Sequence, residues 1–134
     1  MIINGEGAIL GRLASIVAKK ILMGEEVIVV NVEKVVVSGD PKKSADYFLE
    51  KRQRGSFDKG PYYPRHPDRI FRRVVRGMVP YKKTRGKTAL KKLKVYVGCP
   101  ADYKNLERIG KNVEELRSKY TTLGEISRRL GAYG

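Results

Sequence analysis

Four arginines recur at helical spacing in the middle of this chain, at Arg69, Arg72, Arg73 and Arg76. At positions i, i+3, i+4 and i+7 they fall within an arc of about 100° on one face of a helix. Asp68 is the only acidic residue nearby, so these arginines cannot form a lattice of salt bridges. A guanidinium group can hold a phosphate through two parallel hydrogen bonds, which an ammonium group does less well. The spacing therefore predicts a phosphate-binding stripe.

A helix that begins at Pro67 must position this stripe, because proline is tolerated in the first turn. Gly77 and Pro80 are expected to end the helix. The side opposite the arginines is apolar, and we expect it to pack on a sheet. Its residues are Ile70, Phe71, Val74, Val75 and Met78.

Basic residues continue after this helix. Residues 82–94 contain many cations and no acidic residue, while Leu90 and Leu93 are expected to face inward. Such cations neutralise a nucleic-acid backbone and give affinity with little sequence information. The candidates here are Lys82, Lys83, Arg85, Lys87 and Lys91.

The segment before the arginine stripe adds a second group of candidates. A helix beginning at Pro41 is predicted to end in a basic cluster, part of which could simply complement the helix dipole. Residues 55–67 form a long loop in which aromatic side chains alternate with cations, as RNA contacts require. Phe57 could equally pack on the core, and His66 is interpreted as a polar contact without catalytic function. The candidates are Lys51, Arg52, Arg54, Lys59, Tyr62, Tyr63, Arg65 and His66.

The net charge is concentrated in the same region. The chain has 134 residues and a formal charge of +15, and residues 41–100 carry eighteen basic and four acidic side chains. A basic excess spread over several elements and a loop favours nucleic acid over a membrane surface, which would need one contiguous amphipathic helix. The alternative is a merely solvated basic face, although solubilising surfaces normally mix both signs.

Composition excludes several other chemistries. One cysteine (Cys99) and one histidine (His66) cannot build a structural zinc site or an internal disulfide, so a reducing, cytosolic compartment is expected. The apolar run Val27–Val30 is far too short to span a membrane, and the first residues do not resemble a signal peptide. We therefore expect no metal, no membrane partner, no cofactor and no small-molecule substrate.

The first forty residues predict the scaffold. A short strand at residues 1–3, a helix with apolar residues from Leu10 to Ile21 and a buried strand at Val27–Val32 make a βαβ unit. Gly24 is expected to end the helix, and Leu93–Val97 reads as a further strand. The predicted fold is α/β, a three-layer sandwich with a small, mainly parallel sheet.

One domain, residues 1–134, is expected. It comprises the βαβ scaffold (1–40), a basic RNA-binding part (41–100) and a C-terminal helical segment (101–134). In the last segment, Thr122 and Glu125 match a capping box at the start of an amphipathic helix.

Two rival functions remain open at this point. Gly5, Gly7 and Gly11 lie where a dinucleotide-binding fingerprint would lie, but the third glycine comes one residue late. A small nucleotide-dependent enzyme would also need an acidic ribose ligand, for which Glu33 is the candidate. A general DNA-binding protein is the other rival, although no helix-turn-helix or zinc module is visible.

Several blocks of the sequence resemble the large-subunit ribosomal protein L-thirteen family, in its archaeal and eukaryotic branch. They are Leu10–Ser15, Val29–Lys34, Ile70–Pro80, Arg85–Leu90 and Leu93–Gly98, in the family's order. The resemblance implies a non-enzymatic protein of the cytoplasmic ribosome that contacts large-subunit rRNA and neighbouring ribosomal proteins and acts early in subunit assembly. It also implies that the loop before Arg12 lies near RNA, where Arg12 could reach a phosphate beside free backbone N–H groups.

Overall fold

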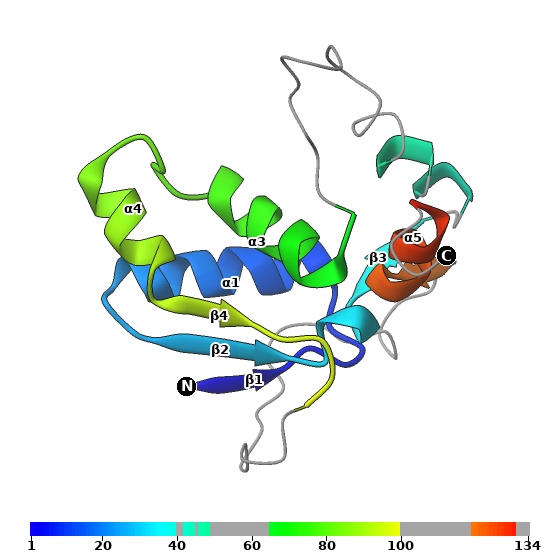
Figure 1. Ribbon diagram of the computed structural model, residues 1–134, viewed down its shortest axis with the longest axis horizontal. Helices are drawn as coiled ribbons and strands as arrows, with labels where there is room; N and C mark the ends of the chain where they lie inside the picture. Colours follow the sequence, from blue (N-terminus) through cyan, green and yellow to red (C-terminus); the bar gives the residue numbers. More distant parts are fainter. Residues whose placement is uncertain (40–41, 45, 49–64, 100–118, 131–134) are drawn as a thin grey trace.

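A three-stranded parallel sheet forms the base of the structure. The computed structural model describes residues 1–39, 42–44, 46–48, 65–99 and 119–130. The strands are β1 (Ile2–Asn4), β2 (Val27–Val30) and β4 (Leu93–Val95), in the order β1-β2-β4. Helices α1 (Leu10–Leu22), α3 (Pro67–Gly77) and α4 (Thr84–Leu90) lie on one side of this sheet (Figure 1). The predicted α/β class, with a parallel sheet built on a βαβ unit, is confirmed.

Helix α1 follows the predicted apolar pattern closely. Its residues Leu13, Ala14 and Val17 are completely buried, and Ile21 is nearly so. Gly24 adopts a φ of +94° just after the last turn, a left-handed conformation that glycine reaches without steric cost. The helix therefore ends where the sequence predicts.

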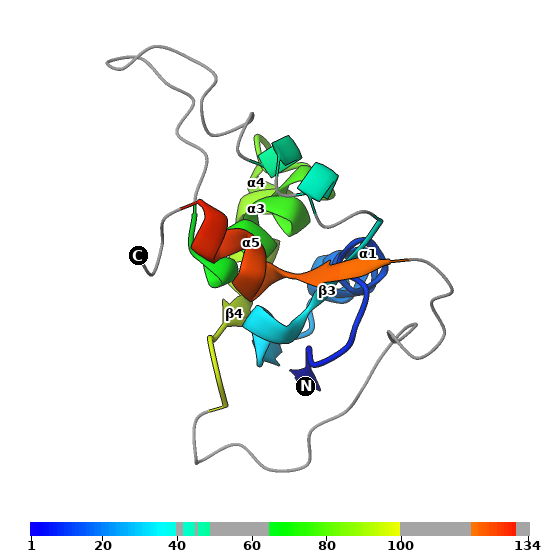
Figure 2. The ribbon, with the colours of Figure 1, turned by 90° about the vertical axis from the view of Figure 1, so that its right-hand side faces the viewer.

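A smaller antiparallel sheet lies beside the parallel one. Strand β3 (Val36–Ser38) pairs with β5 (Tyr120–Thr122), as Figure 2 shows, and the short 3₁₀ helix η1 (Val32–Lys34) connects β2 to β3. Helix α5 (Leu123–Arg129) follows β5 directly, and the backbone N–H of Glu125 donates to Thr122 Oγ1 at 3.2 Å. The predicted cap at Thr122 is confirmed, whereas strand β5 was not predicted.

Helix α3 packs its apolar face into the core. Ile70, Phe71 and Val75 are fully buried, and the helix contacts α1, η1 and β4. The expectation for Met78 was wrong, because its side chain is 43% exposed. The helix ends at Gly77, so Met78 lies in the following turn, and Val79 is the residue that turns back into the core.

The segment between β3 and α3 is described only in part. Residues 42–44 and 46–48 are helical, in agreement with the helix predicted to begin at Pro41, and Phe48 is buried in the core. The rest of that helix and residues 55–64 of the predicted loop lie outside the described residues.

Candidate nucleic-acid interface

The predicted arginine stripe lines a groove between α3 and α4. Pro67 occupies the first turn of α3, and the buried residues Ile70, Phe71 and Val75 fix which face the helix turns outward. The opposite face lines a hollow of about 310 Å³ together with one apolar side chain from α4. The lining residues are Arg69, Arg72, Arg73, Arg76 and Leu90. The structure thus brings all four predicted arginines together.

Arg72 bridges α3 to the opposite wall of this groove. Its Nη1 donates to the Leu93 carbonyl oxygen at 2.8 Å, and its Nη2 donates to the Leu90 carbonyl oxygen at 2.9 Å. The Leu90 carbonyl belongs to the last turn of α4, where helical carbonyls have no partner within the helix. A cation there also complements the negative end of the helix dipole.

Arg76 is held by an aromatic ring. Its guanidinium carbon lies 4.2 Å from the centroid of the Tyr81 ring, in a cation–π contact. Tyr81 packs against the hydrophobic core from the turn that follows α3. Sequence reasoning missed Tyr81 as a site residue. The available signal was an aromatic residue five positions after Arg76, just beyond the predicted end of the helix.

The cations around α4 point into solvent. Gly86 and Ala89 are buried against the rest of the protein, which turns the other side of α4 outward. On the exposed side, none of the cations makes an ion pair within the described part of the chain. These exposed residues are Lys82, Lys83, Arg85, Lys87 and Lys91.

Three further predicted residues that the structure describes do not line the groove. Arg12 is exposed on α1, Arg65 is exposed just before α3, and His66 is the partly buried residue that precedes Pro67. His66 also interacts with another group of the protein. Six candidates lie outside the described residues, namely Lys51, Arg52, Arg54, Lys59, Tyr62 and Tyr63.

Gly5, just after β1, serves packing. A Cβ atom on Gly5 would lie 2.8 Å from Val35 Cγ2 and 3.1 Å from the Val30 carbonyl oxygen, so this position admits no side chain without movement. Gly11, by contrast, has no such neighbour within 4 Å. In a dinucleotide fingerprint the third glycine permits close packing of helix on strand, and Gly11 has no such function here.

The carboxyl edge of the parallel sheet also lacks the features of a nucleotide site. Glu33, the candidate ribose ligand, accepts a hydrogen bond from the Gly98 backbone N–H at 2.8 Å. The strands follow one another in the order β1-β2-β4 with α1, α3 and α4 on the same side (Figure 1), so the described strands include no point at which the strand order reverses. Nucleotides bind open α/β sheets at such reversal points. The geometry argues against the nucleotide-dependent enzyme.

Comparison with known proteins identifies the family. Residues 1–102 match the family described as Ribosomal protein L13. The large ribosomal subunit protein uL13 of Methanosarcina barkeri is 48% identical over 98% of this chain and 97% of its own length. Proteins of the same name from Archaeoglobus fulgidus and Methanocaldococcus jannaschii are 47% and 45% identical, over 99% and 98% of this chain and 88% and 97% of their own lengths. The chain belongs to the ribosomal protein L13 family.

Membership of the L13 family confirms the resemblance seen in the sequence blocks. It also confirms the expectation of a non-catalytic protein whose place is the cytoplasmic ribosome. The family match spans the groove and the whole parallel sheet, since α3, α4 and β4 all lie within residues 1–102.

Two features are absent from the part of the chain that the structure describes. Within the described residues, three or more histidine, cysteine or acidic side chains nowhere gather as metal ligands would. The helices in this part of the chain also include none with the length and apolar character needed to cross a bilayer.

Proposed function

We propose that this L13-family protein is a constituent of the large ribosomal subunit that binds its rRNA and supports early assembly, with rRNA and neighbouring ribosomal proteins as partners. The groove between α3 and α4 carries the proposal. Four arginines line it, and the exposed cations of α4 beside it have no acidic partner among the described residues. Like charges repel one another, so the cations of α4 that lack an acidic partner are favourable beside a polyanion.

The mechanism is charge neutralisation at fixed geometry. The groove offers guanidinium groups in a concave surface, and a guanidinium group can hold phosphate oxygens through two hydrogen bonds. The cations of α4 extend the contact along the RNA backbone. The buried face of α3 and the parallel sheet beneath it hold these groups in place. The segment from Lys51 to Arg65 is proposed to add stacking and ionic contacts.

Binding to fragments of large-subunit rRNA at increasing salt tests the proposal, with duplex DNA of equal length as the comparison. Six to ten phosphate contacts should lower the affinity by about a thousandfold or more between roughly 50 and 200 mM salt. A preference for folded rRNA over DNA is expected. A weak, salt-independent response would contradict the proposal, and equal binding to DNA would contradict recognition of rRNA by the isolated protein.

A matched pair of double variants locates the interface. Arg69→Ala with Arg76→Ala should reduce the slope of log affinity against log salt by about two, one unit for each lost phosphate contact. Arg128→Ala with Arg129→Ala removes the same charge from α5 and should leave the slope unchanged. Equal effects of the two pairs would show that total charge, and not the groove, determines binding.

The assembly role has its own test. Large subunits reconstituted from purified components without this protein should stop as early, incompletely folded particles. Addition of the wild-type protein at the start should relieve this block, whereas the Arg69→Ala, Arg76→Ala variant should not. Normal particles in the absence of the protein would contradict an early role.

A further inference from the structure

Arg72 differs from its neighbours in the groove in what it already contacts within the protein. We propose that Arg72 is a positioning residue that holds the groove in shape, while Arg69 and Arg76 contact RNA phosphates. This inference rests on the proposed function, because it assigns separate tasks within the same site.

The contacts of Arg72 join three elements. The side chain leaves α3 and donates to carbonyl oxygens at the end of α4 and at the start of β4, at 2.9 Å and 2.8 Å. Hydrogen bonds from a charged donor are stronger than neutral ones, and two parallel bonds also fix the plane of the guanidinium group. Arg72 therefore sets the distance between α3 and the wall of the groove that Leu90 contributes.

Arg69 and Arg76 line the groove, and their N–H donors remain available to a ligand there. Arg69 is exposed and makes no hydrogen bond or ion pair within the described residues. Arg76 lies with one face of its guanidinium group on Tyr81. Stacking uses the face of the guanidinium group and leaves the N–H donors on its edges available. It also restricts the side-chain conformations of Arg76, so that less conformational entropy is lost when a phosphate binds.

Charge-conserving variants separate positioning from phosphate contact. Lysine keeps the charge but lacks the planar fork that reaches two carbonyls at once. Arg72→Lys should lower the melting temperature by roughly 4–8 °C. It should also weaken rRNA binding by roughly tenfold, although the net charge is unchanged.

Arg69→Lys is the matched control on the same helix. Its melting temperature should stay within about 1 °C of the wild type and its rRNA affinity within about threefold, because an ammonium group still neutralises a phosphate. If Arg72→Lys behaves like Arg69→Lys in both measurements, Arg72 is not a positioning residue.

Side-chain NMR of the wild-type protein tests the same assignment without a variant. The Arg72 guanidinium N–H signals should be protected from exchange in the free protein and should move little when rRNA is added, while the Arg69 and Arg76 signals should shift. Equal shifts for Arg72 and Arg69 would overturn the proposal. An absence of salt-dependent rRNA binding would overturn the proposed function, whereas protection and melting temperature in the free protein would still decide whether Arg72 holds the groove.

Discussion

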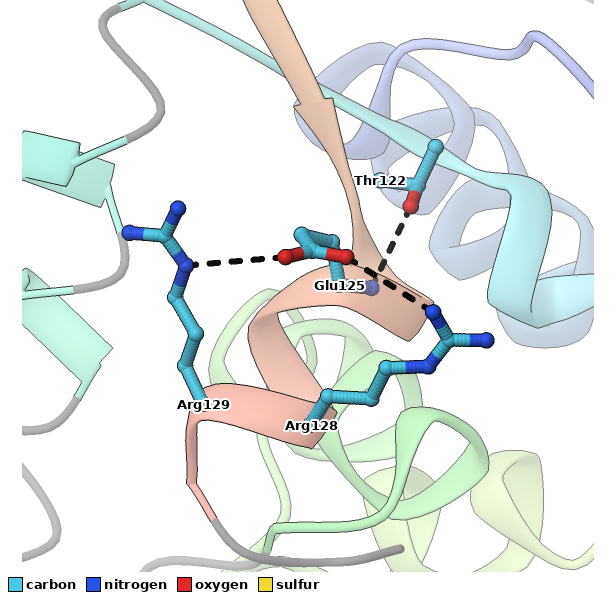
Figure 3. Close-up of polar contacts among 4 residues, drawn as sticks. All are labelled: Thr122, Glu125, Arg128 and Arg129. Atoms are coloured by element: carbon cyan, nitrogen blue, oxygen red, sulfur yellow. Dashed lines mark hydrogen bonds and ion pairs between the residues drawn. The ribbon is translucent and has the colours of Figure 1, made fainter.

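Helices α3 and α5 both carry adjacent arginines, yet the two helices use them in opposite ways. On α5, Arg128 and Arg129 both reach the carboxylate of Glu125, at 3.9 Å and 3.7 Å, so one acidic group serves two cations (Figure 3). On α3, Arg72 binds backbone carbonyls and Arg76 lies over an aromatic ring. The α3 contacts orient the guanidinium groups of Arg72 and Arg76 without pairing either with a carboxylate of the described residues.

This difference separates a partly neutralised surface from an interface. Exposed ion pairs such as those of Glu125 contribute about 0–1 kcal/mol and reduce the local positive field. Arginines held by carbonyls and rings keep a fixed geometry and a positive field, which is what a phosphate-binding surface needs. Counting cations along the sequence does not distinguish these cases, whereas identifying what each one contacts does.

The largest predicted effect comes from a glycine beneath the basic surface of α4. A Cβ atom on Gly86 would overlap the carbonyl oxygen of Pro80 and lie 2.8 Å from the Tyr81 backbone nitrogen. Gly86→Ala should therefore push α4 away from the turn that holds Tyr81. We expect a loss of about 2–4 kcal/mol in the free energy of unfolding, after the better helix propensity of alanine is included. Urea denaturation measures it, and rRNA affinity should fall with it.

Gly124 offers the matching change on α5. A Cβ atom there would lie 3.1 Å from the Glu33 carbonyl oxygen, a contact that small shifts can relieve. Gly124→Ala should cost less than about 1 kcal/mol, because alanine also favours the helix. The salt dependence of rRNA binding should not change. Equal losses of stability in the two variants would mean that α4 is not packed as closely as the structure indicates.

The sequence predicted those parts of the fold that depend on local patterns. The spacing of Leu10, Leu13 and Val17 placed α1, and proline in the first turn placed the start of α3 at Pro67. The stripe of arginines followed from the same helical period. Each of these features depends on residues within a few turns of one another, where periodicity carries the information.

The features that escaped prediction depend on distant partners. Strand β5 pairs with β3, more than eighty residues earlier in the chain. Its tyrosine and two threonines favour strands, but a run of three residues is too short to show a period of two. Arg72 finds its carbonyl partners about twenty residues later, in an arrangement that exists only once α4 and β4 have packed.

A single change on α5 should make its charges resemble those of α3. Glu125→Gln removes the carboxylate shared by Arg128 and Arg129. It keeps the hydrogen bond that the backbone N–H of residue 125 donates to Thr122 Oγ1. Stability should fall by less than about 1 kcal/mol, the value of exposed ion pairs and of an acid near a helix N-terminus. Thermal denaturation measures this change.

Filter binding of the same variant shows whether unpaired charge alone creates an interface. Affinities for rRNA and duplex DNA should rise together, by less than about threefold, because one negative charge fewer acts on any polyanion. The ratio between the two affinities should stay constant. A rise confined to rRNA would show that α5 belongs to the interface and would remove the contrast with α3.

A small gain in stability, with no effect on rRNA binding, is expected at Ser127 on the buried side of α5. Its side chain is completely buried, and its Oγ has no hydrogen-bond partner among the described residues. Burial of a hydroxyl without a partner costs free energy, and alanine fits the same space with a higher helix propensity. Ser127→Ala should therefore raise the free energy of unfolding by about 0.5–1 kcal/mol and leave rRNA binding unchanged. A loss of stability would instead show that the hydroxyl has a partner, such as a buried water molecule, and that α5 is tied to the core by a polar contact, as α3 is tied to β4 by Arg72.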